Sequence, residues 1–299
     1  TKASNAAMLD LFTEPLSYGF VTRALIIGSL TGLVAGLLSC WLILVGWSLL
    51  GDAVSHAVLP GVVISYILDW PYAIGAFIAA LLAVGLVGSV REHTTLKSDT
   101  SIGVVFTALF AFGLVLVSVT PSSTNLQEIL FGNLLGITRA SQLQVIVLGL
   151  VALAIILLRH RDMTLWAFDA EHARAIGINT TAVRWTILVS LALVVVAATQ
   201  AVGVILVVAL LITPGATAFL LTTRFQRMMI IAPLTAVAST WAGVFLSFHL
   251  DVSTGGTIVL VQAAIFLVVY LFGPREGLVT TAALRRRQAR AAREAHATA

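Results

Sequence analysis

About nine long apolar runs, separated by short polar segments, are the feature that most constrains this fold. A helix needs roughly 20 mainly apolar residues to cross the hydrocarbon core of a bilayer. The run at 56–68 is short and the run at 21–45 could break near Gly36, so eight or ten crossings are also compatible with the pattern. We therefore predict an all-α, polytopic transmembrane protein of about eight or nine spans. The runs are residues 21–45, 56–68, 72–90, 102–119, 143–158, 183–199, 202–221, 229–248 and 257–272.

The composition leaves no room for a soluble core, because 59% of the residues are hydrophobic and only 10% are charged. A soluble domain carries roughly a quarter charged residues. We expect one transmembrane domain at 17–274, preceded by a short N-terminal segment at 1–16 and followed by a basic tail at 275–299. The single cysteine, Cys40, excludes a disulfide framework within the chain and is typical of a small buried apolar side chain.

The basic residues lie mostly on alternate connections, which is the pattern of membrane orientation and not of a nucleic-acid-binding face. Cytoplasmic connections carry the excess of lysine and arginine. We therefore expect the long connection at 159–184 and the tail, which lies near lipid headgroups, to be cytoplasmic. The basic residues before the tail that share this predicted side are Arg91, Lys97, Arg159, Arg161, Arg174, Arg184, Arg224 and Arg227.

Asp52 is the one charged side chain that falls inside a long apolar stretch, and His56 follows it four residues later. A carboxylate costs roughly 2.5 to 3.5 kcal/mol to insert at the centre of a membrane helix, so an ionisable residue there usually has a function. Spacing of i, i+4 puts both side chains on one helix face, where they could bind divalent manganese, iron or zinc. The alternative is that Asp52 is the N-cap of a helix that starts after Gly51. The spacing by itself favours neither reading, and two ligands are too few for a dehydrated metal ion.

Small and helix-breaking residues surround this pair, namely Gly46, Gly51, Pro60 and Gly61. They predict a broken or kinked helix, and discontinuous helices form the substrate sites of many transporters. Close packing of helices through small residues explains the same pattern equally well.

The run from Ser48 to Gly61, SLLGDAVSHAVLPG, resembles the signature of the permease subunits of bacterial zinc, manganese and iron ABC importers. Similarities to that family continue in order over the chain, from Leu9 to Gly273. The family usually has a basic pair just before this run, where the present chain has Val45-Gly46-Trp47. The further matching segments are KSDTSIG at 97–103, LFGNLLG at 130–136, the segment at 168–177, QAVG at 200–203 and LITPGA at 211–216.

The resemblance implies the fold and the partners of an importer permease of the metal and cobalamin type. Such a subunit lies in the bacterial inner membrane, pairs with a second permease protomer and receives manganese, zinc or iron from an extracytoplasmic metal-binding protein. It has no cofactor of its own, and a separate ATP-binding cassette subunit binds the ATP. The resemblance maps the metal contacts of the translocation path onto Asp52 and His56, and two protomers would supply two copies of this pair.

The segment at 167–177 predicts a short helix that ends at Gly177, with Phe168 and Ile176 available to dock in a cleft. It resembles the coupling helix through which such permeases contact their ATPase. A helix that lies on the bilayer surface is the alternative. The residues that the resemblance assigns to coupling are Phe168, Asp169, Glu171, Ala173 and Gly177.

Two other function classes compete with an ATP-driven permease. A secondary transporter could couple a cation to protons through Asp52 and His56. An intramembrane protease is disfavoured, because Ser55 and His56 are adjacent and point about 100° apart on a helix. The chain itself has no P-loop, since its two lysines, Lys2 and Lys97, do not end a glycine-rich run. His249 and Asp251 form the second candidate pair for binding a metal ion.

Overall fold

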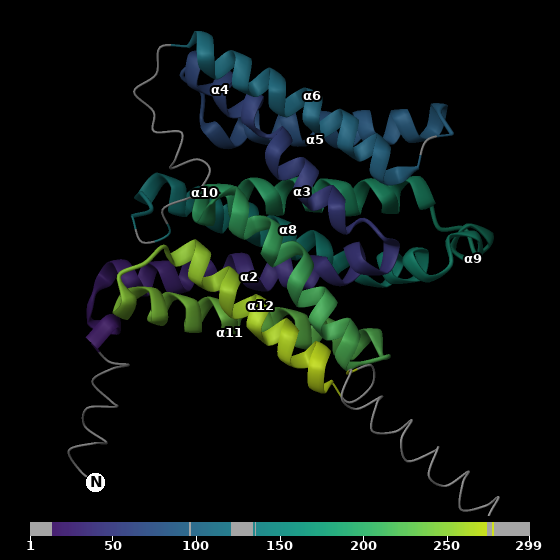
Figure 1. Ribbon diagram of the computed structural model, residues 1–299. Helices are drawn as coiled ribbons and strands as arrows, with labels where there is room; N and C mark the ends of the chain where they lie inside the picture. Colours follow the sequence, from purple (N-terminus) through teal and green to yellow (C-terminus); the bar gives the residue numbers. More distant parts are fainter. Residues whose placement is uncertain (1–13, 96, 121–133, 135, 274–276, 278–299) are drawn as a thin grey trace, which may run out of the picture.

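The computed structural model describes residues 14–95, 97–120, 134, 136–273 and 277, and the described part is helical throughout its regular elements (Figure 1). The segments at 1–13 and 278–299, which include most of the predicted N-terminal segment and basic tail, lie outside the described residues. The helices are α2 (Gly19–Val45), α3 (Ser48–Ala57), α4 (Leu59–Ile67), α5 (Tyr72–His93), α6 (Ser98–Val119), α8 (Arg139–Phe168), α9 (Ala170–Ala175), α10 (Thr180–Leu221), α11 (Phe225–Leu250) and α12 (Thr254–Phe272).

The apolar runs form the membrane-crossing helices that the sequence predicts. Within the described residues, eight helical segments are long and apolar enough to cross a membrane, and Leu206–Leu221 is a shorter apolar helix. The short run at 56–68 gains its length from the residues before it, because α3 and α4 together make the single segment Ser48–Ile67. The fold is therefore an all-α, polytopic bundle.

Helix α2 lies at the centre of the bundle and stays continuous through Gly36, so the break considered there does not occur. Its glycines serve close packing against α11. A Cβ atom at Gly36 would come within 3.0 Å of the Ala232 carbonyl oxygen, and one at Gly32 within 3.4 Å of the Ala236 carbonyl oxygen. Small residues let membrane helices approach at backbone distance, which replaces the hydrophobic driving force that lipid does not provide.

The chain breaks at Gly46 instead, directly before the segment that carries Asp52 and His56. Gly46 has φ 74°, a left-handed conformation that ends α2, and the Trp47 amide donates to the Leu42 carbonyl oxygen at 2.7 Å. Helix α3 then begins at Ser48, and Val58 separates it from α4, which has a proline in its first turn. The predicted interrupted helix is thus confirmed.

Helix α10 folds back on itself at Gly203, whose φ of 78° and ψ of 165° are not helical. Near its start, the Arg184 guanidinium lies 3.2 Å from the Cβ position of Gly88, close to the end of α5. Near the C-terminal end of α10, Gly215 packs on Ser39, which lies close to the end of α2. Both ends of α10 therefore face the same end of the bundle, the end where Figure 1 shows α9. The two apolar runs at 183–199 and 202–221 are the two arms of this hairpin.

We expect a large side chain at Gly75 to destabilise the fold, because α4 and α5 meet there at backbone distance. A Cβ atom at Gly75 would collide with the Gly61 carbonyl oxygen, and the Gly75 amide donates to Ser65 Oγ at 3.1 Å. Gly75→Leu should therefore lower the yield and Tm of the detergent-purified protein strongly, since overpacking costs about 1–3 kcal/mol even without a backbone collision. Gly85→Leu is the matched control on α5, because a Cβ there meets nothing within 4 Å. Equal Tm values for the two variants would contradict this packing.

Candidate metal translocation site

Asp52 and His56 lie on one face of α3, as their spacing predicts. The His56 Nε2 atom is 3.4 Å from Asp52 Oδ1, and the two side chains remain 29% and 38% exposed, respectively. Helix α3 starts four residues before Asp52, with Trp47 at its N-cap position and no side-chain capping bond. The N-cap interpretation of Asp52 is therefore wrong. Its carboxylate lies inside a helix and stays accessible to a ligand.

The imidazole of His56 is held between aromatic rings of α6, which sequence reasoning did not identify. The Phe110 ring meets it edge to face at a centroid distance of 5.4 Å, and the Phe106 ring lies 5.9 Å away. Such contacts restrict the ring orientation without using its nitrogens, so Nε2 remains directed at Asp52. Phe106 and Phe110 are four residues apart and therefore share one face of α6. The local sequence did not show which helix this face would contact.

A small, partly open cleft lies beside the imidazole, between α3, α4, α6 and the bend of α10. Its lining is mainly apolar, with Thr199 supplying a hydroxyl from the first arm of α10. The Ser55 hydroxyl donates to the Asp52 carbonyl oxygen at 2.7 Å, so it is bound to its own helix and not to His56. This arrangement does not make a serine nucleophile. The lining residues are Ser55, His56, Val58, Leu59, Val62, Phe110, Thr199 and Val204.

The described residues of one chain do not complete a metal site around this pair. Among the described residues, no group of three or more histidine, cysteine, aspartate and glutamate side chains is close enough to hold a metal ion. At the far end of α11, His249 Nδ1 contacts the Phe245 carbonyl oxygen at 2.8 Å, and Asp251 adopts a left-handed conformation that ends the helix. His249 and Asp251 thus have local structural roles.

Aromatic side chains connect the start of α3 to the C-terminal end of α8. The Trp47 and Trp166 rings lie 5.6 Å apart, and the Arg91 guanidinium lies 5.9 Å from the Trp47 ring centroid. A cation over an indole face is attracted by the ring quadrupole. A basic group from the end of α5 therefore lies beside the residue that precedes α3.

The predicted short helix is present as α9, although the first two residues of the predicted segment, Ala167 and Phe168, belong to the preceding helix. Asp169 Oδ1 accepts from the His172 amide at 2.8 Å and caps α9. Gly177, with φ 90°, follows the end of α9, and the Ile178 amide donates to the Ala173 carbonyl oxygen at 3.0 Å. These bonds fix both ends of a helix too short to be stable by itself.

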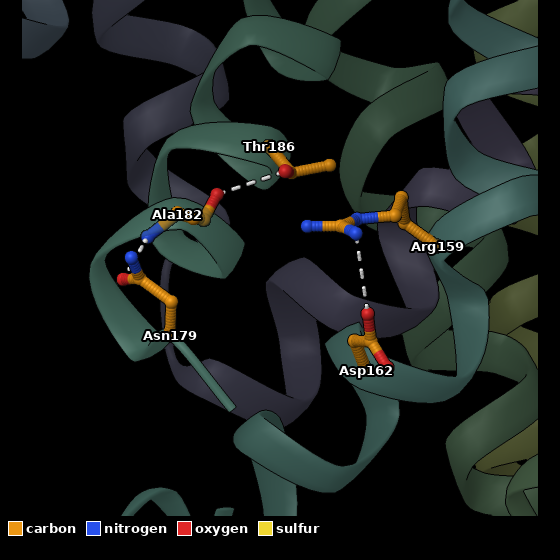
Figure 2. A network of polar contacts seen from close by, with 5 residues as sticks. All are labelled: Arg159, Asp162, Asn179, Ala182 and Thr186. Carbon is orange, nitrogen blue, oxygen red and sulfur yellow. Dashed lines mark hydrogen bonds and ion pairs between the residues drawn. The ribbon is translucent and has the colours of Figure 1, made fainter. Parts of the chain in front are cut away.

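Residues 159–168, predicted as part of a long connection, continue α8 as a helix. Thirty residues of helix span about 45 Å, whereas the hydrocarbon core is about 30 Å thick, so α8 extends beyond the membrane. An ion pair between Arg159 and Asp162, 3.6 Å apart, lies on this extension. Figure 2 shows this pair beside the start of α10, where Asn179 accepts from the Ala182 amide at 3.0 Å.

The five residues predicted for coupling occupy two different environments. Ala173 is completely buried against its own chain, so its side chain presents no surface to a partner. Phe168 and Ile176 are 61% and 56% exposed, which leaves apolar surface at both ends of α9. The Phe168 ring meets Phe225 of α11 edge to face at 5.8 Å. Glu171 is exposed on α9 itself.

A bundle with eight apolar helical segments long enough to cross a membrane, a partly exposed carboxylate–imidazole pair on α3 and a short capped helix at one end is the architecture of a multi-pass membrane protein. The family model described as the ABC 3 transport family matches residues 17–273, and the chain belongs to this family. It is a multi-pass permease of an ABC transport system, located in the bacterial inner membrane.

Several bacterial membrane proteins resemble this chain in sequence, and one solved structure resembles it in fold. The manganese transport system membrane protein MntB of Synechocystis is 46% identical over 89% of this chain and 87% of its own length. The chelated iron transport system membrane protein YfeD of Yersinia pestis is 43% identical over 89% of both chains. A chain of PsaBC from Streptococcus pneumoniae, solved with a Fab, superposes with a TM-score of 0.82 at 35% identity, covering 90% of this chain and 97% of that one.

Proposed function

We propose that this chain forms the translocation path of an ATP-driven importer for a divalent transition-metal ion: manganese, zinc or iron. The observation that carries the proposal is the accessible Asp52–His56 pair inside an apolar helix, next to a cleft at the bend of α10. Carboxylate oxygen and imidazole nitrogen are ligands that suit all three metals. The names of the manganese and iron relatives support the same class of cargo.

The ligand count supports a dimer of permease chains. A transition metal generally takes about four to six ligands, and one chain offers two at this site. A two-fold axis beside α3 would place a second Asp52–His56 pair opposite the first and would double the set to two carboxylates and two imidazoles. The metal would then pass along the interface between the protomers.

The other subunits of the importer would bind at the two ends of the bundle. A separate ATP-binding cassette subunit would bind ATP and dock on α9 through the exposed Phe168 and Ile176. Asp169 and Gly177 would stabilise the two ends of α9. An extracytoplasmic metal-binding protein would deliver the ion at the opposite end. The chain would contribute no catalytic group to ATP hydrolysis and would act only as the transport subunit.

The energy source is tested by uptake into proteoliposomes that contain this chain with its ATPase partner and binding protein. We expect accumulation of Mn²⁺, Zn²⁺ or Fe²⁺ to require ATP and to persist when an ionophore collapses the proton gradient. Empty liposomes and liposomes with a non-hydrolysable ATP analogue provide the background. Uptake that follows the proton gradient without ATP would instead establish a proton-coupled secondary transporter, with Asp52 and His56 as the coupling groups.

The dimer is tested by disulfide cross-linking in a Cys40→Ala background, because Cys40 is the only cysteine of the chain. We expect His56→Cys to cross-link two copies of the chain in at least one transport state, since the proposed axis brings the two α3 helices together. Leu260→Cys, at a 71% exposed position of α12, is the control for random collision in the membrane. Cross-linking at position 260 without any at position 56 would place the path within a single chain.

A further inference from the structure

A second polar feature lies inside the apolar bundle, away from the Asp52–His56 pair. Gln262 is in the middle of α12 and only 3% exposed. Its Oε1 and Nε2 atoms are both buried and have no hydrogen-bond partner among the described residues. A primary amide can donate two hydrogen bonds and accept two, and a buried amide that makes none is strongly disfavoured in an apolar environment.

The Gln262 side chain lines a pocket between α12, α11 and the second arm of α10. The pocket is partly open, and the space in it that the centre of a water molecule can reach is about 10 Å³, which is room for about one water molecule. Its lining residues are Thr213, Pro214, Thr217, Thr235, Gln262 and Ile265.

The other polar groups of the pocket still have acceptor capacity. Thr217 Oγ1 donates to the Thr213 carbonyl oxygen at 2.7 Å, and Thr235 Oγ1 donates to the Ala232 carbonyl oxygen at 2.8 Å. Each of these hydroxyl oxygens has lone pairs left, because a hydroxyl can donate once and accept twice. Pro214 has no amide hydrogen, so the helix next to the pocket lacks one backbone bond.

We propose that this pocket is a buried water-binding site that bridges α10, α11 and α12 within the membrane. Water fits the chemistry, because one molecule can donate to Gln262 Oε1 or to a threonine oxygen and accept from Gln262 Nε2. The lining side chains contain neutral oxygen and amide groups and no carboxylate or imidazole, so a dehydrated divalent metal ion would lack charge compensation. Buried waters typically make two to four hydrogen bonds, which this set of groups can supply.

A water molecule bound in this pocket would help to hold the second arm of α10 in place. The second arm of α10 contacts α3 through Leu211, whose Cδ1 atom is 3.0 Å from the Cβ position of Gly51. Thr213 and Thr217 of the same arm line the water pocket on the side of α11 and α12. The water would therefore join the arm that packs on the Asp52-bearing helix to the outer pair of helices.

Radiolytic footprinting of the full chain in lipid nanodiscs with ¹⁸O-labelled water tests the site directly. Hydroxyl radicals formed from a bound water oxidise the side chains around it, even where bulk water does not reach. We expect ¹⁸O incorporation at Pro214 and Ile265 to be several-fold above that at Ile258, which is completely buried on α12 outside the pocket. Labelling of Pro214 and Ile265 no higher than that of Ile258 would overturn the proposal.

Two variants separate a bound water from an unsatisfied amide in a dry pocket. Gln262→Leu and Thr235→Val should each reduce the ¹⁸O incorporation at Pro214 several-fold, because each removes a partner of the water. With water bound, Gln262→Leu should leave the Tm unchanged or lower it. A rise in Tm, caused by removal of an unpartnered amide, would show that the pocket is dry. If a variant fails to fold, the labelling of the wild-type chain decides the question by itself.

Discussion

Substituting either member of the Asp52–His56 pair is expected to reduce ATP-driven metal uptake by about 100-fold or more. Asp52→Asn keeps the size of the side chain but removes its charge, and His56→Gln removes the ring nitrogen. The loss of even an outer partner of a metal ligand costs about 10- to 100-fold, and a direct ligand should matter at least as much. Because both residues are partly exposed on α3, the variants should insert and fold normally. Initial rates of ⁵⁴Mn or ⁶⁵Zn uptake at matched protein levels measure the effect.

The chain offers a matched pair of controls at the end of α11. His249→Gln and Asp251→Asn make the same chemical changes, and asparagine tolerates the left-handed conformation of Asp251. These controls should retain uptake within a factor of about two, because such surface substitutions rarely change stability by more than 0.5 kcal/mol. Normal uptake by the α3 variants together with loss in the α11 variants would move the metal path to His249 and Asp251.

A charge at the exposed apolar ends of α9 is expected to separate the permease from its ATPase. Ile176→Glu places a carboxylate at a position that is 56% exposed in the chain alone and that would be covered by the partner. Loss of one central interface residue commonly costs about 2 kcal/mol, which corresponds to roughly 30-fold in Kd. Binding of the purified ATPase to the permease in nanodiscs measures this change, and transport should fall with it.

Val252→Glu tests whether any new surface charge has the same effect. Val252 is 50% exposed at the opposite end of the bundle, so this variant should bind the ATPase with unchanged affinity. A bulky residue at the buried Ala173 should lower Tm first and affect ATPase binding only through misfolding of α9. If Ile176→Glu binds the ATPase normally, α9 is a helix that lies on the membrane surface and does not couple transport to hydrolysis.

The sequence predicted the local features of this protein because their causes are local. Run length and hydropathy mark the spans, since crossing a bilayer sets a minimum length for each helix. Fixed helical geometry places residues four apart on one face, and so the Asp52–His56 pair formed as predicted. Gly177 follows the end of α9 as predicted, because helix capping depends on residues within one turn.

Other features depended on contacts between residues far apart in the chain, which spacing does not reveal. Gly36 is equally compatible with a break or with close packing, and only the approach of α11 shows that it serves packing. The burial of Ala173 depends on how α9 lies against α8 and α10. Phe106 and Phe110 had no recognisable role until α6 lay beside α3.

The sequence therefore determined which segments are helical and that Asp52 and His56 share one face of α3, whereas the tertiary structure decided what encloses this pair. The reversal of α10 at Gly203 brings Thr199 and Val204 to the His56 cleft, and it brings Thr213 and Thr217 to the Gln262 pocket. In a chain this apolar, nearly every helix face is a suitable packing surface, so hydrophobic periodicity does not select the neighbours. Shape selects them instead, through small residues that allow close approach and through polar groups that must find partners inside the membrane.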